Sequence, residues 1–121
     1  MGYSPQTNDV AREWILKILD KDNEKLFVSE NKGKINGWVH AFITNRVASP
    51  PFIEIAGLVV APENRRAGAG TELVKNIENW ANSLGLKVRV RCNVIRKDAH
   101  KFYEALGFVN NKSQHVFEKS L

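Results

Sequence analysis

The chain has 121 residues, of which 43% are apolar and 26% charged, and its formal net charge is +5. This length predicts one domain, residues 1–121, that needs neither disulfides nor a metal to fold. Cys92 is the only cysteine, and His40, His100 and His115 lie too far apart for zinc-ligand spacing, so we expect no metal site. Without a long apolar run or a leader, the sequence predicts a cytoplasmic protein that does not enter membranes.

The positive charge gathers at Arg65–Arg66 and between Arg89 and Lys101. A nucleic-acid binder often concentrates its charge in a stripe instead. Both basic runs flank segments that suit a small phosphorylated ligand. We therefore expect no nucleic-acid partner.

The first half of the chain predicts one helix and three strands. Apolar residues recur at helical spacing over about 7–20. Strands are expected over 25–30 and 35–44, antiparallel to each other and joined by a turn in which Gly33 takes a positive φ. A third strand is expected over 52–60, and its apolar end favours a central place in the sheet.

The second half predicts two helices and two strands. Gly85 should end the first helix, whose buried face is formed by Leu73, Val74, Ile77, Trp80, Ala81 and Leu84. A half-buried strand over 87–92 follows it, parallel to the third strand because a helix crosses between them. A helix over about 98–106 and a closing strand over 115–119 complete the order α-β-β-β-α-β-α-β. The fold class is therefore α/β with a mixed sheet.

A strand, a glycine-rich turn and an amphipathic helix follow one another across residues 59–71. Backbone N–H groups at a helix start have no partner within the helix, and the helix dipole adds partial positive charge. Gly68 and Gly70 permit close approach, and Arg65 and Arg66 add cations. The segment predicts a phosphate or pyrophosphate site, and the alternative is a loop that uses glycine only to turn.

This segment lacks the lysine of a P-loop, and position 73 is leucine where the dinucleotide-binding fingerprint needs glycine or alanine. Instead, Arg65-Arg66-Ala67-Gly68-Ala69-Gly70 resembles the acetyl-CoA loop of the GNAT superfamily of N-acetyltransferases, Gln/Arg-x-x-Gly-x-Gly/Ala. Residues 99–108, AHKFYEALGF, resemble a second signature of that family, A-x-x-F-Y-x-x-x-G-F. The tail, 114–119, is similar to bacterial members related to the aminoglycoside 6′-acetyltransferases, so the resemblance covers Gly2 to Leu121.

The resemblance implies a GNAT-like fold, mostly antiparallel, with one central parallel strand pair that splays apart and flanking helices. It implies acetyl-CoA as the acetyl donor. The backbone of the third strand would pair with the pantetheine arm at Leu58, Val59 and Val60. The pyrophosphate would be held by Arg65, Arg66, Ala67, Gly68, Ala69, Gly70 and Thr71. Asn93 would hydrogen-bond the arm, although many members place their asparagine where this chain has Arg96.

Two residues would carry the chemistry. Tyr103 corresponds to the tyrosine that protonates the leaving thiolate, the alternative being a packing role. Glu54 interrupts an apolar strand and resembles the general base of some members, the alternative being a solvent-facing or salt-bridged glutamate. Gly57 is expected at a bulge of the same strand. We expect His40 to be a surface residue rather than a substrate-side group.

The leading hypothesis is an acetyl-CoA-dependent N-acetyltransferase that transfers acetyl directly, in a ternary complex, to a primary amine of a small molecule or peptide. The alternative is a non-catalytic acyl-CoA-binding module that acts as a subunit or sensor. It arises because the chain begins after the first strand and helix that wall the acceptor pocket in the family. The strand over 25–30 would then be a sheet edge with open backbone groups, which predicts a homodimer.

Overall fold

The computed structural model describes residues 8–61, 68–91, 97–111 and 114–120. The chain forms two compact units, Met1–Val90 and Arg91–Leu121. Among the described residues, no helix combines the length and the apolar character that crossing a membrane requires.

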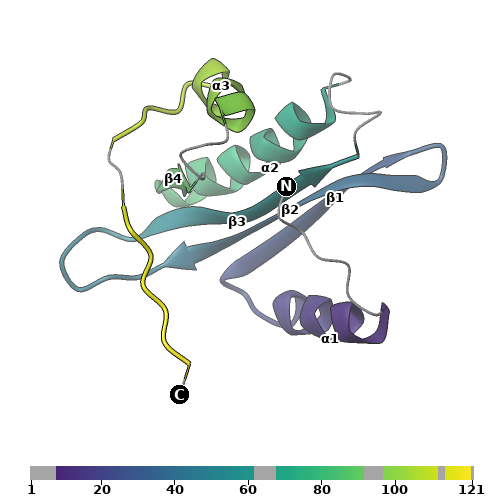
Figure 1. The fold of residues 1–121 in the computed structure, drawn as a ribbon, viewed down its shortest axis with the longest axis horizontal. Coiled ribbons are helices and arrows are strands. Elements are labelled where there is room, and N and C mark those ends of the chain that lie inside the picture. The colour runs from purple at the N-terminus through teal and green to yellow at the C-terminus, as the bar shows by residue number, and fades with distance from the viewer. Residues whose placement is uncertain (1–7, 62–67, 92–96, 112–113, 121) are drawn as a thin grey trace. The chain divides into compact units, whose positions relative to one another are not determined.

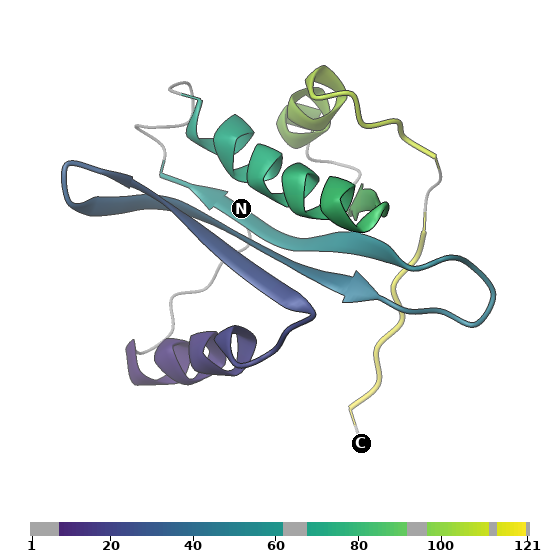
Figure 2. The ribbon, with the colours of Figure 1, turned by 180° about the vertical axis from the view of Figure 1, so that it is seen from behind.

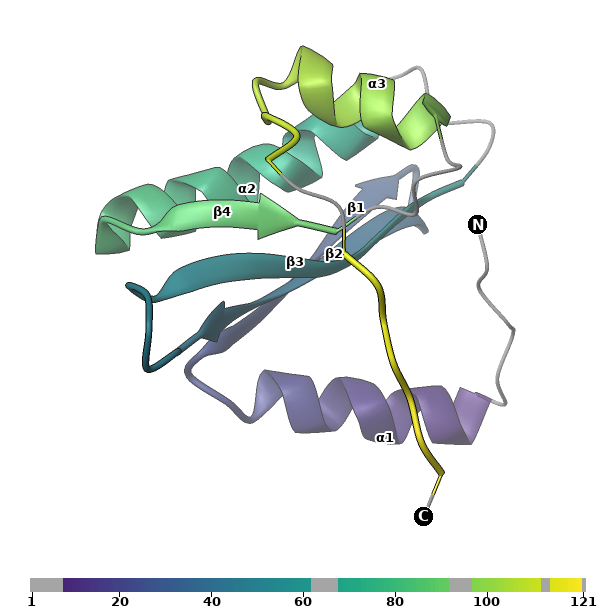
Figure 3. The same cartoon turned by 60° about the vertical axis from the view of Figure 1, so that its left-hand side comes forward.

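The first unit is a four-stranded sheet with two helices, and its elements are α1 (Asn8–Leu19), β1 (Glu24–Asn31), β2 (Lys34–Thr44), β3 (Phe52–Val60), α2 (Ala69–Leu84) and β4 (Lys87–Val90). The strands lie in the order β1-β2-β3-β4 (Figures 1 and 2). β1, β2 and β3 pair antiparallel, and β3 pairs with β4 in parallel. The predicted mixed sheet with one parallel pair is confirmed. α2 and α1 lie against opposite faces of it (Figure 3).

The core lies between α2 and the middle of the sheet, and side chains exposed by 4% or less line it on both sides: Val39, Ala41, Ile53, Ile55, Leu73, Val74, Ile77 and Ala81. Each fully buried aliphatic side chain contributes about 1.5–3 kcal/mol. The helical face predicted for α2 is confirmed at Leu73, Val74, Ile77 and Ala81, whereas Leu84 is 48% exposed. Gly85 ends α2 with φ 68°, as expected, and Leu86 N–H donates to Ala81 O.

Two β-bulges set the register of the sheet. Between Ser29↔Gly37 and Glu30↔Ile35, β2 carries one extra residue, Asn36. Between His40↔Gly57 and Ala41↔Ile55, β3 carries one extra residue, Ala56. The bulge that we expected at Gly57 is therefore present one residue earlier. Bulges of this kind bend a strand and change which residues share a face.

Helix α1 forms where the apolar periodicity predicts it. Its apolar side chains are nevertheless exposed in the described structure, by 52% at Trp14, 41% at Ile15, 56% at Leu16 and 61% at Leu19. The strand next to it, β1, pairs with β2 on one side and is the edge of the sheet among the described residues. Periodicity thus predicts the helix correctly but does not show what covers its apolar stripe.

The second unit contains α3 (Lys97–Ala105), which Gly107 ends with φ 94°. Phe108 N–H donates to Tyr103 O and Gly107 N–H donates to Glu104 O, both at 3.0 Å. The closing strand predicted over 115–119 is wrong, because residues 114–120 form neither helix nor strand. A strand needs a ladder partner and a packed face, and here Val116 and Phe117 are 79% and 92% exposed.

Candidate functional site

Helix α2 begins at a glycine. Gly68 is its N-cap, in the left-handed conformation with φ 87° and ψ 3°, and among the described residues no side chain caps the helix. A Cβ at Gly68 would touch nothing within 4 Å, so the backbone conformation, rather than crowding, favours glycine here. The first-turn amides at Ala69, Gly70 and Thr71 have no acceptor within the helix, as at any helix start. Such amides bind phosphate oxygens. Of the other predicted loop residues, Arg65, Arg66 and Ala67 lie outside the described residues.

The ladder of the parallel strand pair covers only the first part of β3. It runs from Phe52↔Lys87 to Ile55↔Val90, where β4 ends. β3 continues through Val60 beyond that last pair and stays in register with β2. Leu58 and Val59 are half-buried there. The role of this stretch in pairing with a pantetheine arm stays a prediction. Asn93, predicted to bind the same arm, lies outside the described residues.

Glu54 lies in a row of residues that crosses the whole sheet. The register pairs Glu24 with Phe42, Phe42 with Glu54, and Glu54 with Arg89. Directly paired residues point to the same face, so both carboxylates flank the Phe42 ring on one surface. Glu54 is half-buried, as expected of a glutamate in an apolar strand. Its role as the general base stays a prediction.

Arg89 also contacts an aromatic ring on this face. Its guanidinium lies 4.0 Å from the ring centroid of Phe52, and that of Arg46 lies 5.1 Å from the same ring. Phe52 is 3% exposed, so its ring fixes Arg89 beside the row that holds Glu54.

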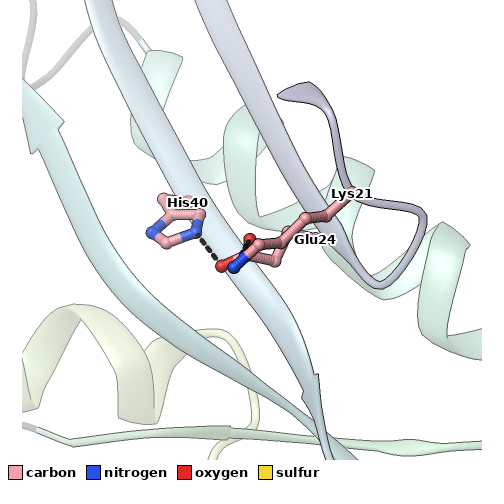
Figure 4. A network of polar contacts seen from close by, with 3 residues as sticks. All are labelled: Lys21, Glu24 and His40. Carbon is pink, nitrogen blue, oxygen red and sulfur yellow. Dashed lines mark hydrogen bonds and ion pairs between the residues drawn. The ribbon is translucent and has the colours of Figure 1, made fainter. Parts of the chain in front are cut away.

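The expectation of a surface His40 is wrong. Its side chain is 18% exposed, and Nε2 lies 3.2 Å from Oε1 of Glu24 (Figure 4). Oε2 of Glu24 lies 3.6 Å from Nζ of Lys21. Glu24 was not predicted from the sequence. Regular pairing of β1 with β2, counted residue by residue from their turn, places Glu24 opposite Ala41, on the face that α2 covers. The Asn36 bulge moves it opposite Phe42, on the other face.

Tyr103 lies in the second unit, in an aromatic cluster. Its ring centroid is 5.1 Å from that of Phe102 and 5.6 Å from that of Phe108, both edge to face. The last residue of the F-Y-x-x-x-G-F pattern therefore packs on its tyrosine. Tyr103 is half-buried, and its role as the general acid stays a prediction. Among the described residues, no group of three or more His, Cys, Asp or Glu could hold a metal ion.

A family model decides which family these features belong to. The model of the acetyltransferase (GNAT) family matches residues 2–108. The chain belongs to the GNAT acetyltransferase family. Its predicted membership of this family is therefore confirmed.

Two curated relatives of this GNAT chain are both named aminoglycoside N(6′)-acetyltransferase type 1. The protein of Acinetobacter genomosp. 13 is 28% identical over 64% of this chain. The protein of Acinetobacter baumannii is 30% identical, also over 64% of this chain. Each match covers 53% of the relative, so the chain spans about half the length of the curated relatives it matches.

Solved structures show the same fold. The aminoglycoside acetyltransferase AAC(6′)-Iy, in complex with the bisubstrate analogue CoA-S-monomethyl-acetylneamine, superposes with a TM-score of 0.86 at 21% identity, over 98% of this chain and 84% of that one. AAC(6′)-IG from Acinetobacter haemolyticus superposes with a TM-score of 0.83 at 19% identity, over 98% of this chain and 85% of that one. At such identities the likeness shows the fold, and it confirms the GNAT-like arrangement of the sheet.

Proposed function

We propose that this chain is an acetyl-CoA-dependent N-acetyltransferase that transfers acetyl directly, in a ternary complex, to a primary amine of a small molecule or peptide. The observation that carries the proposal is the α2 N-terminus, whose N-cap is a left-handed glycine, Gly68, without a capping side chain in the described part of the chain. The strand before it, β3, extends beyond the last residue that pairs with β4. Such a start suits a pyrophosphate, and such a strand suits a pantetheine arm. Membership of the GNAT family, across residues 2–108, supports the same ligand.

The chemistry would use the two predicted side chains. Acetyl-CoA supplies the activated acetyl group. Glu54 takes a proton from the acceptor ammonium, directly or through one water, so that the neutral amine can attack the thioester carbonyl carbon. As the C–N bond forms and the C–S bond breaks, Tyr103 donates its proton to the departing sulfur. A phenol can do this because its ordinary pKa, near 10, is close to that of a thiol.

The names of the curated relatives support a small-molecule amine as the acceptor, since both act on aminoglycosides. We also propose that the chain works as a homodimer. The support is the edge strand β1, with Val28 52% exposed, beside the exposed apolar side chains of α1. A reducing compartment such as the cytoplasm suits the single cysteine, Cys92.

The test is a turnover assay with acetyl-CoA and a panel of amines, following release of the CoA thiol. Glu54→Gln and Tyr103→Phe should each lower kcat by about 10²–10⁴-fold, because each removes one proton transfer. Neither should change the Kd of acetyl-CoA. Glu30→Gln, which neutralises an exposed carboxylate on β1, is the matched control and should leave kcat unchanged.

Two results would contradict the proposal. Wild-type turnover in both Glu54→Gln and Tyr103→Phe would remove the assigned roles. Binding of acetyl-CoA with neither acetyl transfer nor thioester hydrolysis across the panel would favour the alternative, a non-catalytic acyl-CoA-binding module.

A further inference from the structure

The Glu24–His40 pair has no part in the mechanism above, although it lies on the same sheet face as Glu54. His40 is 18% and Glu24 15% exposed, and each comes from a different strand. Figure 4 shows the imidazole and the carboxylate facing each other across β1 and β2, with Lys21 reaching the carboxylate from the turn before β1. A polar pair this well shielded has a defined geometry rather than the mobility of a surface contact.

The hydrogen bond selects one form of the imidazole. An ionised carboxylate can only accept, so Nε2 of His40 must carry the proton that Oε1 of Glu24 receives at 3.2 Å. In the neutral ring, Nδ1 is then unprotonated and can accept a proton. This pair is thus built to hold a proton acceptor.

The register brings His40 near Glu54. His40 is paired with Gly57, which has no side chain, and Glu54 is paired with Phe42 in the next row of the same face. In this register, His40 and Glu54 belong to successive rows of one sheet face, with the Ala56 bulge of β3 between them. The ring of Phe42, which is paired with Glu54, lies 6.0 Å from the His40 ring.

Other charged groups on this face also come from several elements. Lys21 and Glu24 lie on the β1 side, and Glu54 and Arg89 lie on β3 and β4. Three charged side chains of α1 are exposed: Arg12, Glu13 and Lys17.

Acetylation of an ammonium releases two protons from nitrogen, one before the amine attacks and one as the amide forms. We propose that His40 accepts the second of these at Nδ1, while Glu54 accepts the first. The C–N bond forms, the C–S bond breaks, and Tyr103 protonates the sulfur. Afterwards His40 and Glu54 each give a proton to solvent and Tyr103 takes one back, so that one proton is released for each acetyl group transferred. This inference rests on the proposed function.

The first arm of the test needs no activity. Nitrogen-15 spectra of the free chain at neutral pH should show the His40 ring with the proton on Nε2 and none on Nδ1. The signal is assigned by its loss in His40→Gln. Glu24→Gln should shift the ring toward a mixture of both neutral forms, because the carboxylate that selects one is gone. A proton on Nδ1 in the wild type would overturn the inference.

The second arm measures kinetics. His40→Gln keeps a donor for Glu24 but cannot take a proton, so kcat should fall by about 10–100-fold and the loss of rate toward low pH should become shallower. The Kd of acetyl-CoA should not change. His115→Gln, in an exposed part of the second unit, should leave both the rate and the pH profile unchanged.

The outcomes separate the two proposals. If the wild type transfers acetyl and His40→Gln keeps its rate and pH profile, the role of His40 is wrong and the proposed function stands. If His40→Gln loses stability and its rate falls equally at every pH, the Glu24–His40 hydrogen bond only stabilises the fold, and the inference is again overturned. If the wild type binds no acetyl-CoA and transfers nothing, both proposals fall together.

Discussion

Gly57 has no room for a side chain, because the indole ring of Trp38 lies against it. An ideal Cβ at this position would be 2.9 Å from Cζ3 and 3.0 Å from Cη2 of Trp38. The indole therefore occupies the space that any side chain at position 57 would need. It lies against the bulged part of β3, two register pairs from Glu54. A change at a residue without a side chain should thus be felt across the candidate site.

We expect Gly57→Ala to lower the free energy of unfolding by about 1–3 kcal/mol, because the added methyl group overpacks the Trp38 ring. Urea unfolding, followed by circular dichroism, measures the loss. Trp38→Leu removes the two clashing atoms, so Gly57→Ala should cost less in that background. Equal costs in both backgrounds would show that Trp38 does not set the limit.

At the scale of elements, α2 has a left-handed glycine at each end. Gly68 has φ 87° and Gly85 has φ 68°, and a Cβ at either would touch nothing within 4 Å. The two ends of this 16-residue helix lie about 24 Å apart. Only the Gly68 end carries the first-turn amides, so the two glycines form a matched pair for testing the phosphate site proposed at that end.

Gly68→Ala and Gly85→Ala should each cost about 1–2 kcal/mol of stability, because both force alanine into the left-handed region. Only Gly68→Ala should weaken acetyl-CoA, by roughly tenfold, since it displaces the first-turn amides. Isothermal titration with acetyl-CoA measures this difference. An equal loss of affinity in both variants would mean that α2 binds nothing at its N-terminus.

Helices and turns were predicted correctly where the signal that determines them lies within a few residues. Gly33 and Gly85 mark the ends of their elements, and apolar spacing marks α2, because both signals act within a few residues. The strand expected over 115–119 failed because a strand depends on a partner that no local signal supplies. Register failed for the same reason, since nothing around Asn36 announces the bulge that brings Glu24 to the face of Glu54.

The candidate site was predicted from motifs rather than from geometry. Motif spacing led to Gly68, Gly70 and Glu54 without a structure. His40 was misjudged because alternation along β2 places it on a face but does not show that Glu24 shields it. Such a contact joins residues 16 apart in sequence and needs the register of two strands.

For the molecule as a whole, the main feature is the exposed apolar surface of β1 and α1. Trp14, Leu16, Leu19 and Val28 are each more than half exposed beside an edge strand. A surface of this kind favours association, because it offers both backbone partners and apolar area.

We therefore expect a dimer at micromolar concentration by light scattering. Val28→Lys should shift the mass to that of a monomer, because a lysine on an edge strand opposes pairing. Val47→Lys is the control, since Val47 is fully exposed outside the strands and should not affect the mass. A monomeric wild type would refute the proposed dimer.

The central claim is that this GNAT chain binds acetyl-CoA at the open start of α2. Thermal unfolding of the wild type with and without acetyl-CoA tests it most directly. At about one hundred times Kd, the ligand should add roughly 2.7 kcal/mol to stability and raise Tm accordingly. Gly85→Ala should keep that gain, and Gly68→Ala should lose much of it. An unchanged Tm of the wild type at millimolar acetyl-CoA would contradict the account.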